Sequence, residues 1–156
     1  MTPLSPHVRL AVAADLGAIT RLACALWPDE PEEEHADHAR AILAGEPEST
    51  LPLVLFVAEV DDAVVGFIEV GLRSHADGCD TRQAVGFIEG WYVEPHVQRR
   101  GVGRALMSAA EEWARQQGAS ELGSDTWIDS PLSQQAHAAL GFEVVDRVVN
   151  FRKALR

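Results

Sequence analysis

Apolar and polar residues follow two different periods along the chain. We predict helices at residues 16–27, 29–45, 101–117 and 131–140. The first and third segments repeat apolar residues at helical spacing, the second opens on an acidic stretch, and the fourth has Pro131 near its start. Each segment is followed by a residue that commonly ends a helix, namely Pro28, Gly45, Gly118 and Gly141. Shorter apolar runs predict strands at residues 8–11, 53–60, 64–72, 85–93, 122–127, 142–145 and 148–153.

The order of these elements is typical of a mixed α/β protein. A central strand, loop and helix, residues 85–117, is flanked by predicted hairpins on both sides. With 156 residues the chain has the size of one domain with one core. We therefore expect a single domain over residues 1–156.

The charge balance narrows the class of partner. The chain has 13 basic and 24 acidic residues, for a formal net charge of -11. Phosphate binding needs a basic face, so this balance argues against nucleic acid as a partner. It suits a small cationic substrate, which a negative surface attracts, although acidity also serves solubility alone.

The cysteines and the apolar runs bear on the compartment. Cys24 and Cys79 are too few for a disulfide framework and suit a reducing environment. The first residues lack a basic segment followed by an apolar run, so we expect no signal peptide. The longest apolar run, near residues 51–58, is far too short to span a membrane. These features predict a cytoplasmic protein.

The loop before the predicted helix 101–117 has the features of an anion site. The first N–H groups of a helix have no partner within the helix, and with the helix dipole they bind phosphate groups. Gly101 and Gly103 carry no Cβ, which lets a phosphate approach the backbone. Arg99, Arg100 and Arg104 add positive charge to an otherwise acidic chain. The loop is neither a Walker loop nor a GxGxxG dinucleotide turn. The alternative to an anion site is therefore an ordinary helix start that contains glycine.

The loop sequence Gln98-Arg99-Arg100-Gly101-Val102-Gly103 resembles the acetyl-CoA pyrophosphate loop of the GNAT superfamily of N-acetyltransferases. Glu94-Pro95 before it and Ala139-Leu140-Gly141-Phe142 after the last helix are similar to that superfamily as well. The resemblance implies the GNAT fold, a mostly antiparallel central sheet that is flanked by helices and splayed between strands 85–93 and 122–127. Acetyl-CoA would lie in that cleft, with the Val93 N–H as oxyanion donor. The implied cofactor contacts are Trp91, Tyr92, Val93, Gln98, Arg99, Arg100, Gly101, Val102, Gly103, Arg104 and Ala105.

Several further blocks resemble the aminoglycoside 6'-N-acetyltransferases. They are Leu26-Trp27-Pro28, Asp77-Gly78-Cys79-Asp80, Phe87-Ile88-Glu89-Gly90, Gly123-Ser124-Asp125-Thr126 and the segment 133–142. The resemblance implies that Asp125 binds the amine side of the antibiotic and that Glu89 is the better of the two candidates for the base. Trp27 would form an apolar wall, with a core filler at the end of its helix as the alternative. The resemblance also implies a homodimer that exchanges strand 148–153, which would bring Asp146 to the partner's acceptor pocket.

The two strand carboxylates support this interpretation independently. Glu89 and Asp125 lie in predicted central strands, where a carboxylate loses hydration and needs a partner such as a cationic substrate. Strand alternation predicts Phe87, Glu89, Trp91 and Val93 on one face. The alternative for each carboxylate is solvation or an internal salt bridge.

The remaining candidates have less defined roles. Many GNAT enzymes have a tyrosine where this chain has His137, so His137 is a candidate general acid, and packing or contact with CoA is an equal alternative. Neither cysteine has an evident base beside it, so direct attack in a ternary complex is simpler than a ping-pong route. His35 and His38 lie on a predicted acidic helix, where we expect them to be solvated, and we expect no metal site.

Two other functions compete with aminoglycoside acetylation. One is a GNAT transferase for another amine, such as a polyamine or a protein amine. The other is a non-catalytic acyl-CoA-binding sensor, which the carboxylates at Glu89 and Asp125 disfavour.

Overall fold

The computed structural model describes residues 2–156 and contains a five-stranded sheet. The strands lie side by side in chain order: β1 (His7–Leu10), β2 (Leu53–Val60), β3 (Ala63–Arg73), β4 (Val85–Val93) and β5 (Leu122–Ser124). Strands β1 to β4 are antiparallel and β5 pairs with β4 in parallel. The predicted mixed α/β class and mostly antiparallel sheet are confirmed.

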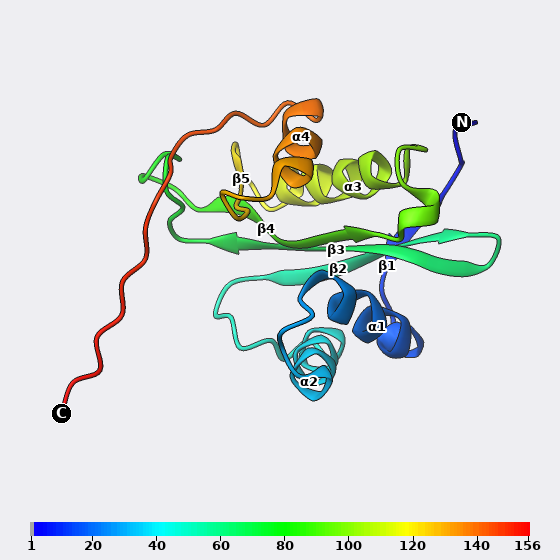
Figure 1. The fold of residues 1–156 in the computed structure, drawn as a ribbon, viewed down its shortest axis with the longest axis horizontal. Coiled ribbons are helices and arrows are strands. Elements are labelled where there is room, and N and C mark those ends of the chain that lie inside the picture. The colour runs from blue at the N-terminus through cyan, green and yellow to red at the C-terminus, as the bar shows by residue number, and fades with distance from the viewer. Residues whose placement is uncertain (1) are drawn as a thin grey trace.

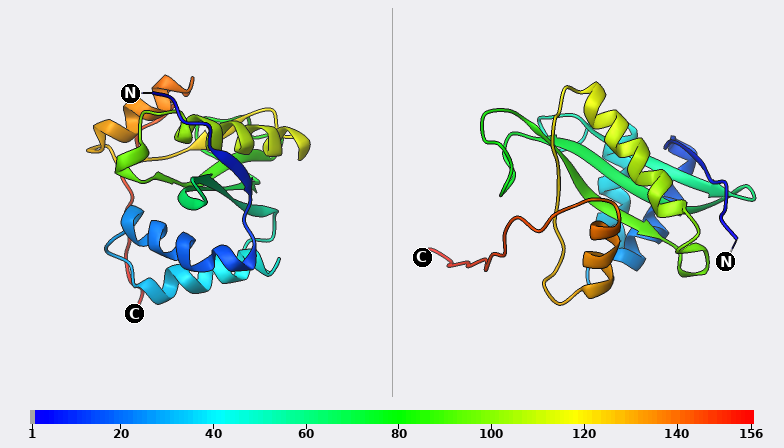
Figure 2. Two further views of the ribbon diagram at one scale, coloured as in Figure 1. Left: turned by 90° about the vertical axis from the view of Figure 1, so that its right-hand side faces the viewer. Right: turned by 90° about the horizontal axis from the view of Figure 1, so that it is seen from above.

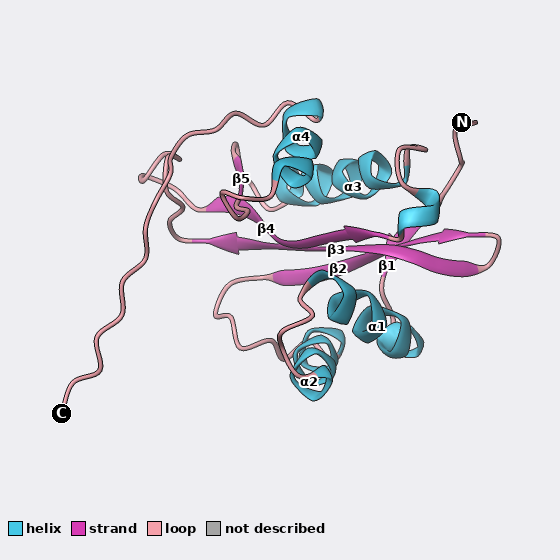
Figure 3. Cartoon of the chain, viewed as in Figure 1, coloured by secondary structure: helices cyan, strands magenta, loops and turns pink. Residues whose placement is uncertain are grey.

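Helices cover both faces of this sheet (Figure 1 and Figure 3). Helices α1 (Leu16–Leu26) and α2 (Glu32–Leu43) lie on one face, and α3 (Val102–Gln116) and α4 (Pro131–Ala139) lie on the other. Single turns of 3-10 helix span Ala13–Asp15 and Pro95–Val97. None of the helices in residues 2–156 is long and apolar enough to cross a membrane.

Alternation along β3 divides the core into two halves. Phe67 packs with α1 and α2, whereas its neighbour Ile68 packs with Leu106 and Met107 of α3. Both side chains are almost completely buried, and this period of two is what a strand covered on both faces requires.

Strands β4 and β5 part soon after they meet. They pair only at Gly86 with Leu122, Phe87 with Gly123, and Ile88 with Ser124. Beyond Ile88 the edge of β4 has no strand partner on the β5 side among the described residues. The predicted splay is confirmed, but the predicted extension of β5 to residue 127 is wrong. Residues 125–127 diverge from β4, so they have no ladder to join and are exposed.

A β-bulge at Glu89 changes the phase of β4. Gly90 pairs with Glu69 of β3 and Ile88 pairs with Val70, so Glu89 is left without a partner across the ladder. Ile88, Trp91 and Val93 consequently share the α3 side, while Phe87 belongs to a separate cluster with Ala76 and Val85. The predicted common face for Phe87, Glu89, Trp91 and Val93 is therefore wrong.

The C-terminal segment forms no strand within this chain. Residues 142–156 run as a coil whose C-terminal part extends away from the sheet (Figure 1 and Figure 2). The expected strands at 142–145 and 148–153 are wrong for the single chain, because a strand needs a neighbouring edge for its backbone groups. The segment exposes large apolar side chains, namely Val144, Val145, Val148, Val149, Phe151 and Leu155.

Candidate active site

The loop between β4 and α3 folds back onto the end of β4. The side-chain amide of Gln98 donates to the Val93 carbonyl at 2.8 Å. The first bond within α3 runs from the Ala105 N–H to the Gly101 carbonyl. The N–H groups of residues 102–104 precede that bond and have no acceptor inside the helix, so they form a backbone site for an anion.

The two glycines of this loop serve different structural needs. Gly101 has φ +93°, a left-handed conformation that favours glycine. A Cβ on Gly103 would lie 3.1 Å from the Trp91 ring, so its absence lets the indole pack against the first turn of α3. The indole Nε1 of Trp91 is buried there without a hydrogen-bond partner among the described residues.

The three arginines of the loop are not equivalent. The Arg100 guanidinium donates to the Thr2 carbonyl at 3.0 Å, and the Arg100 carbonyl accepts from the Leu4 N–H at 2.9 Å. The N-terminal segment thus braces the outer side of the loop. Arg99 and Arg104 are exposed beside the start of α3, and Arg104 also donates to the Ala139 carbonyl at 3.4 Å.

A carboxylate of β4 and a guanidinium of β3 form an ion pair. Both oxygens of Glu89 accept from Arg73, the last residue of β3, at 2.7 and 2.6 Å. The guanidinium carbon lies 3.6 Å from the centre of the Phe87 ring. The hydrogen bonds that Arg73 donates to Glu89 raise the pKa of Arg73, with smaller contributions from the charges of Glu89 and Asp125. The internal salt bridge that was the alternative for Glu89 is therefore formed.

Asp125 lies just past the end of β5 and is exposed. Its predicted place inside a central strand is wrong, since β5 ends at Ser124. Its charge is the smallest of the contributions that raise the pKa of Arg73.

His137 of α4 contacts the last residue of β5. Its Nδ1 is 2.8 Å from the Ser133 carbonyl, and its Nε2 is 2.8 Å from the Ser124 hydroxyl. The ring meets Trp91 and Phe142 edge-on, with centroids 5.4 and 5.2 Å apart. Both ring nitrogens are thus occupied within the chain.

The arrangement of a phosphate-type loop, a splayed strand pair and flanking carboxylates agrees with the comparison to known proteins. The sequence profile of the acetyltransferase (GNAT) family matches residues 17–142. The chain belongs to the GNAT family.

Curated relatives place this GNAT chain more closely. It is 40% identical over 97% of its length to an aminoglycoside N(6')-acetyltransferase type 1 of Klebsiella aerogenes, covering 98% of that protein. It is 43% identical over 90% of its length to a protein of the same name from Serratia marcescens, covering 94% of it.

Solved structures agree with these relatives. The aminoglycoside acetyltransferase AAC(6')-Iy, in complex with the bisubstrate analog CoA-S-monomethyl-acetylneamine, superposes with a TM-score of 0.86 at 32% identity. The two chains cover 97% and 99% of each other. AAC(6')-IG of Acinetobacter haemolyticus gives a TM-score of 0.86 at 30% identity, over 96% of this chain and 99% of that one.

Trp27 of this GNAT chain packs beneath β4. A Cβ on Gly90 would lie 2.6 Å from the Trp27 ring, so the glycine allows the indole to touch the strand. Trp27 also stacks on His35 at 5.9 Å and meets Phe67 at 6.4 Å. The expectation of a solvated His35 is wrong: the ring is 5% exposed, and its Nε2 lies 3.1 Å from the Trp27 carbonyl.

His38 is exposed as expected, but it has a specific partner. Its Nε2 lies 2.8 Å from a carboxylate oxygen of Glu69, a residue of β3 that is only 4% exposed. This hydrogen bond is the main cause of a raised pKa for His38. Within residues 2–156, no three His, Cys, Asp or Glu side chains are placed to hold a metal ion.

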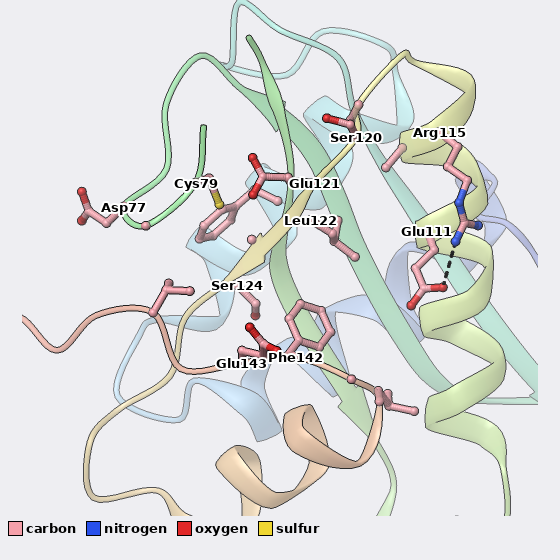
Figure 4. A pocket seen from close by; sticks show the side chains of 18 residues that line it. Asp77, Cys79, Glu111, Arg115, Ser120, Glu121, Leu122, Ser124, Phe142 and Glu143 are labelled. Carbon is pink, nitrogen blue, oxygen red and sulfur yellow. Dashed lines mark ion pairs between the residues drawn. The ribbon is translucent and has the colours of Figure 1, made fainter. Parts of the chain in front are cut away.

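A cavity of about 450 Å³ lies beside β5, between the C-terminal half of α3 and residues 140–145 (Figure 4). Cys79 and Glu121 line it, and burial together with the Glu121 charge raises the pKa of the Cys79 thiol. Phe87 and Ser124 also line it, so the cavity reaches the point where β4 and β5 part. Asp146 lies further along the exposed C-terminal segment and accepts from the Arg147 N–H.

Sequence reasoning missed three polar residues of this region: Arg73, Glu69 and Ser124. In the sequence Arg73 follows an apolar strand and resembles an ordinary loop residue. Only the pairing of β3 with β4 brings its positive charge near Glu89 and so indicates a role in the site. Glu69 carried a signal that was available, because it is a carboxylate inside the apolar run 64–72.

Proposed function

We propose that this chain is an acetyl-CoA-dependent N-acetyltransferase that acetylates the 6'-amine of aminoglycoside antibiotics, by direct attack in a ternary complex. Residues 1–156 act as one GNAT domain. The observation that carries the proposal is that β5 parts from β4 after Ile88, which leaves the edge of β4 open between Glu89 and the loop before α3. We propose that Glu89 and Asp125 line the acceptor side of this opening. The relatives named as aminoglycoside N(6')-acetyltransferases support the choice of acceptor.

The cofactor side would hold acetyl-CoA by its backbone groups. The pyrophosphate would bind the free N–H groups of residues 102–104, with the charges of Arg99 and Arg104 nearby. The full set of proposed contacts is Trp91, Tyr92 and Val93 along β4, and Gln98, Arg99, Arg100, Gly101, Val102, Gly103, Arg104 and Ala105 in the loop. Because Arg100 already bonds Thr2, its part is to hold the loop in shape.

Val93 would supply the oxyanion hydrogen bond. The Glu94 N–H donates to Val65 of β3, and N–H groups alternate in direction along a strand. The Val93 N–H therefore points to the open edge of β4. The Val93 carbonyl accepts from the Gln98 side chain. The Val93 N–H remains available to the oxygen of the thioester.

The acceptor side would hold a polycation. Asp125 would bind the amine, Glu89 would hold it and accept its proton directly or through water, and Trp27 would form an apolar wall. An alkylammonium has a pKa of ~10, so a proton must leave before attack. Both oxygens of Glu89 accept from Arg73, so Glu89 is placed to hold a cation as well as to accept a proton. Cys79 does not compete as a nucleophile, because its raised pKa keeps the thiol protonated.

A second copy would complete the assembly. We propose a homodimer in which residues 148–153 of one chain add a strand to the other and bring Asp146 toward its acceptor pocket. The outer edge of β5 has no strand partner among the described residues, and the cavity beside it adjoins this edge. The exposed apolar side chains of the C-terminal segment suit such a role. We place the enzyme in the cytoplasm, which its two free cysteines favour.

The test of the function uses two drugs and a mass spectrometer. The purified protein is incubated with acetyl-CoA and either kanamycin A, which has a 6'-amine, or a counterpart with a 6'-hydroxyl. Acetylation of the first drug alone, located on the 6'-nitrogen, is the expected result. Equal labelling of both drugs would place the chemistry elsewhere on the ring system. If neither drug is labelled, a thiol-release assay with a panel of polyamines and protein N-termini tests for another amine substrate. No thiol release with any of these amines would indicate a binding protein without transferase activity.

A further inference from the structure

One side chain links the two splayed strands on the α4 side of the opening. Ser124 is the last residue of β5 that pairs with β4, and its hydroxyl lies 2.8 Å from Nε2 of His137. The same ring meets Trp91 of β4 edge-on, at 5.4 Å and 89°. His137 therefore contacts both strands close to the point at which they part.

The hydrogen-bond partners assign the protons of this ring. The Ser133 carbonyl can only accept, so Nδ1 of His137 carries the hydrogen of that 2.8 Å bond. In the neutral ring Nε2 then has a lone pair, and it accepts the hydrogen of the Ser124 hydroxyl. The neutral ring has no N–H left over to give to a departing thiolate.

Two further contacts hold the His137 ring in place. Phe142 packs edge-on against it at 5.2 Å and 75°, and the Nδ1 bond ties it to its own helix. A general acid needs a proton that faces the reacting atoms, whereas both nitrogens of this ring face partners within the chain, Ser133 and Ser124.

We propose that His137 is a positioning residue that sets the width of the β4–β5 opening for the pantetheine arm, through Ser124 and Trp91, and is not the general acid. The inference rests on the proposed transferase function. In the reaction the C–N bond forms and the C–S bond breaks, the amine proton leaves to a carboxylate or water, and CoA leaves as a thiolate that takes its proton from solvent. His137 exchanges no proton in these steps.

Four variants test the inference: His137→Ala, His137→Gln, Ser124→Ala and the double alanine variant. A glutamine amide reaches the place of Nε2, accepts from Ser124 and does not titrate. The exposed His7→Gln of β1, far from the opening, is the matched control. The readouts are CoA affinity by calorimetry, kcat and KM for acetyl-CoA, and the pH profile of kcat, with thermal melting to show that each variant folds.

The expected result is a loss of CoA affinity on removing either partner. His137→Ala and Ser124→Ala each weaken CoA binding about 5-fold, the loss typical of one hydrogen bond, and the double variant is no worse than His137→Ala. His137→Gln restores most of the affinity and keeps kcat and its pH profile.

Two results would overturn the inference. One is a His137→Gln variant that binds CoA normally but loses kcat and the alkaline limb of its pH profile, since that identifies a proton donor. The other is full additivity of the two alanine substitutions. Failure of the proposed function is seen separately, as a wild-type protein that acetylates no amine, and the CoA-binding comparison still stands in that case.

Discussion

Arg73 and Glu89 form a bidentate ion pair at the mouth of the acceptor side, with the guanidinium stacked on Phe87. The guanidinium occupies a place that a substrate ammonium would take, because it is a cation held by the carboxylate that the substrate needs. Both partners are partly exposed, so the pair can open without creating a buried charge. We therefore regard Arg73 as an internal competitor for the acceptor site.

Removing this cation is expected to strengthen acceptor binding. Arg73→Gln should lower the KM for an aminoglycoside about 2- to 5-fold, because a partly exposed ion pair is worth up to ~1 kcal/mol. Arg73→Lys retains the charge and should stay near wild type, and Arg82→Gln, in the loop that follows β3, is the control. Steady-state kinetics at low ionic strength gives the comparison. A KM that rises in Arg73→Gln would mean that Arg73 orients Glu89 for the substrate.

The two acceptor carboxylates should separate by their effect on kinetics. Asp125→Asn should weaken aminoglycoside binding about 10-fold, the low end for a charge-assisted hydrogen bond because Asp125 is exposed, and leave CoA affinity unchanged. Glu89→Gln should lower kcat more than acceptor affinity. Calorimetry with each ligand and steady-state kinetics check both statements. Wild-type values in both variants would remove these carboxylates from the site.

The sequence predicted what depends on local pattern and missed what depends on pairing. The four helices and the central strands were predictable, because their periodicity and their ends at residues such as Pro28 and Gly118 are local. The bulge at Glu89 was not, since it is a property of the register with β3. The short β5 and the coil at residues 142–156 depend on whether a neighbouring edge exists.

The site shows the same division. The loop between β4 and α3 was predictable because it is contiguous in sequence, and its role in binding the cofactor stays a prediction. The Arg73–Glu89 pair joins residues on neighbouring strands, and His137 reaches Ser124 from another element. Only the fold brings these pairs together, so spacing along the chain carried little signal for them.

The cofactor loop should be sensitive to added side-chain atoms at Gly103. Gly103→Val should push Trp91 away from α3 and abolish measurable CoA binding, because an added Cβ already lies 3.1 Å from the ring. Gly101→Ala should cost ~1–2 kcal/mol of unfolding free energy from its left-handed backbone. Gly17→Ala, with nothing within 4 Å of its Cβ, is the control. Calorimetry and thermal melting are the measurements, and unchanged CoA affinity in Gly103→Val would contradict the loop assignment.

The His38–Glu69 pair predicts a pH dependence of stability. The pKa of His38 is raised, first by its hydrogen bond to Glu69 and then by the charges of Glu69, Glu48 and Glu89, against the effect of burial. Protonation of His38 therefore stabilises the folded state. This contribution to the free energy of unfolding is complete below the unfolded pKa of ~6.5, and it is lost as the pH rises through the higher pKa of the folded state. The stability difference between wild type and His38→Gln should shrink over that range. Urea unfolding between pH 5 and pH 9 measures it, and a difference that stays constant with pH would contradict the pairing.

The C-terminal segment should control assembly. In the single chain Phe151 is 92% exposed and Leu155 is 89% exposed, yet only Phe151 lies within residues 148–153, which we propose to pair with a second copy. A charge buried at such an interface is costly, so Phe151→Asp should shift a dimer toward monomer, whereas Leu155→Asp should leave it intact. Sedimentation velocity at micromolar concentration separates the species. If Asp146 of the second copy reaches the acceptor pocket, dissociation of the dimer should lower the affinity for aminoglycosides. Asp146→Asn should then weaken acceptor binding without dissociating the dimer. A wild-type protein that sediments as a monomer with full activity would show that one chain forms the whole site.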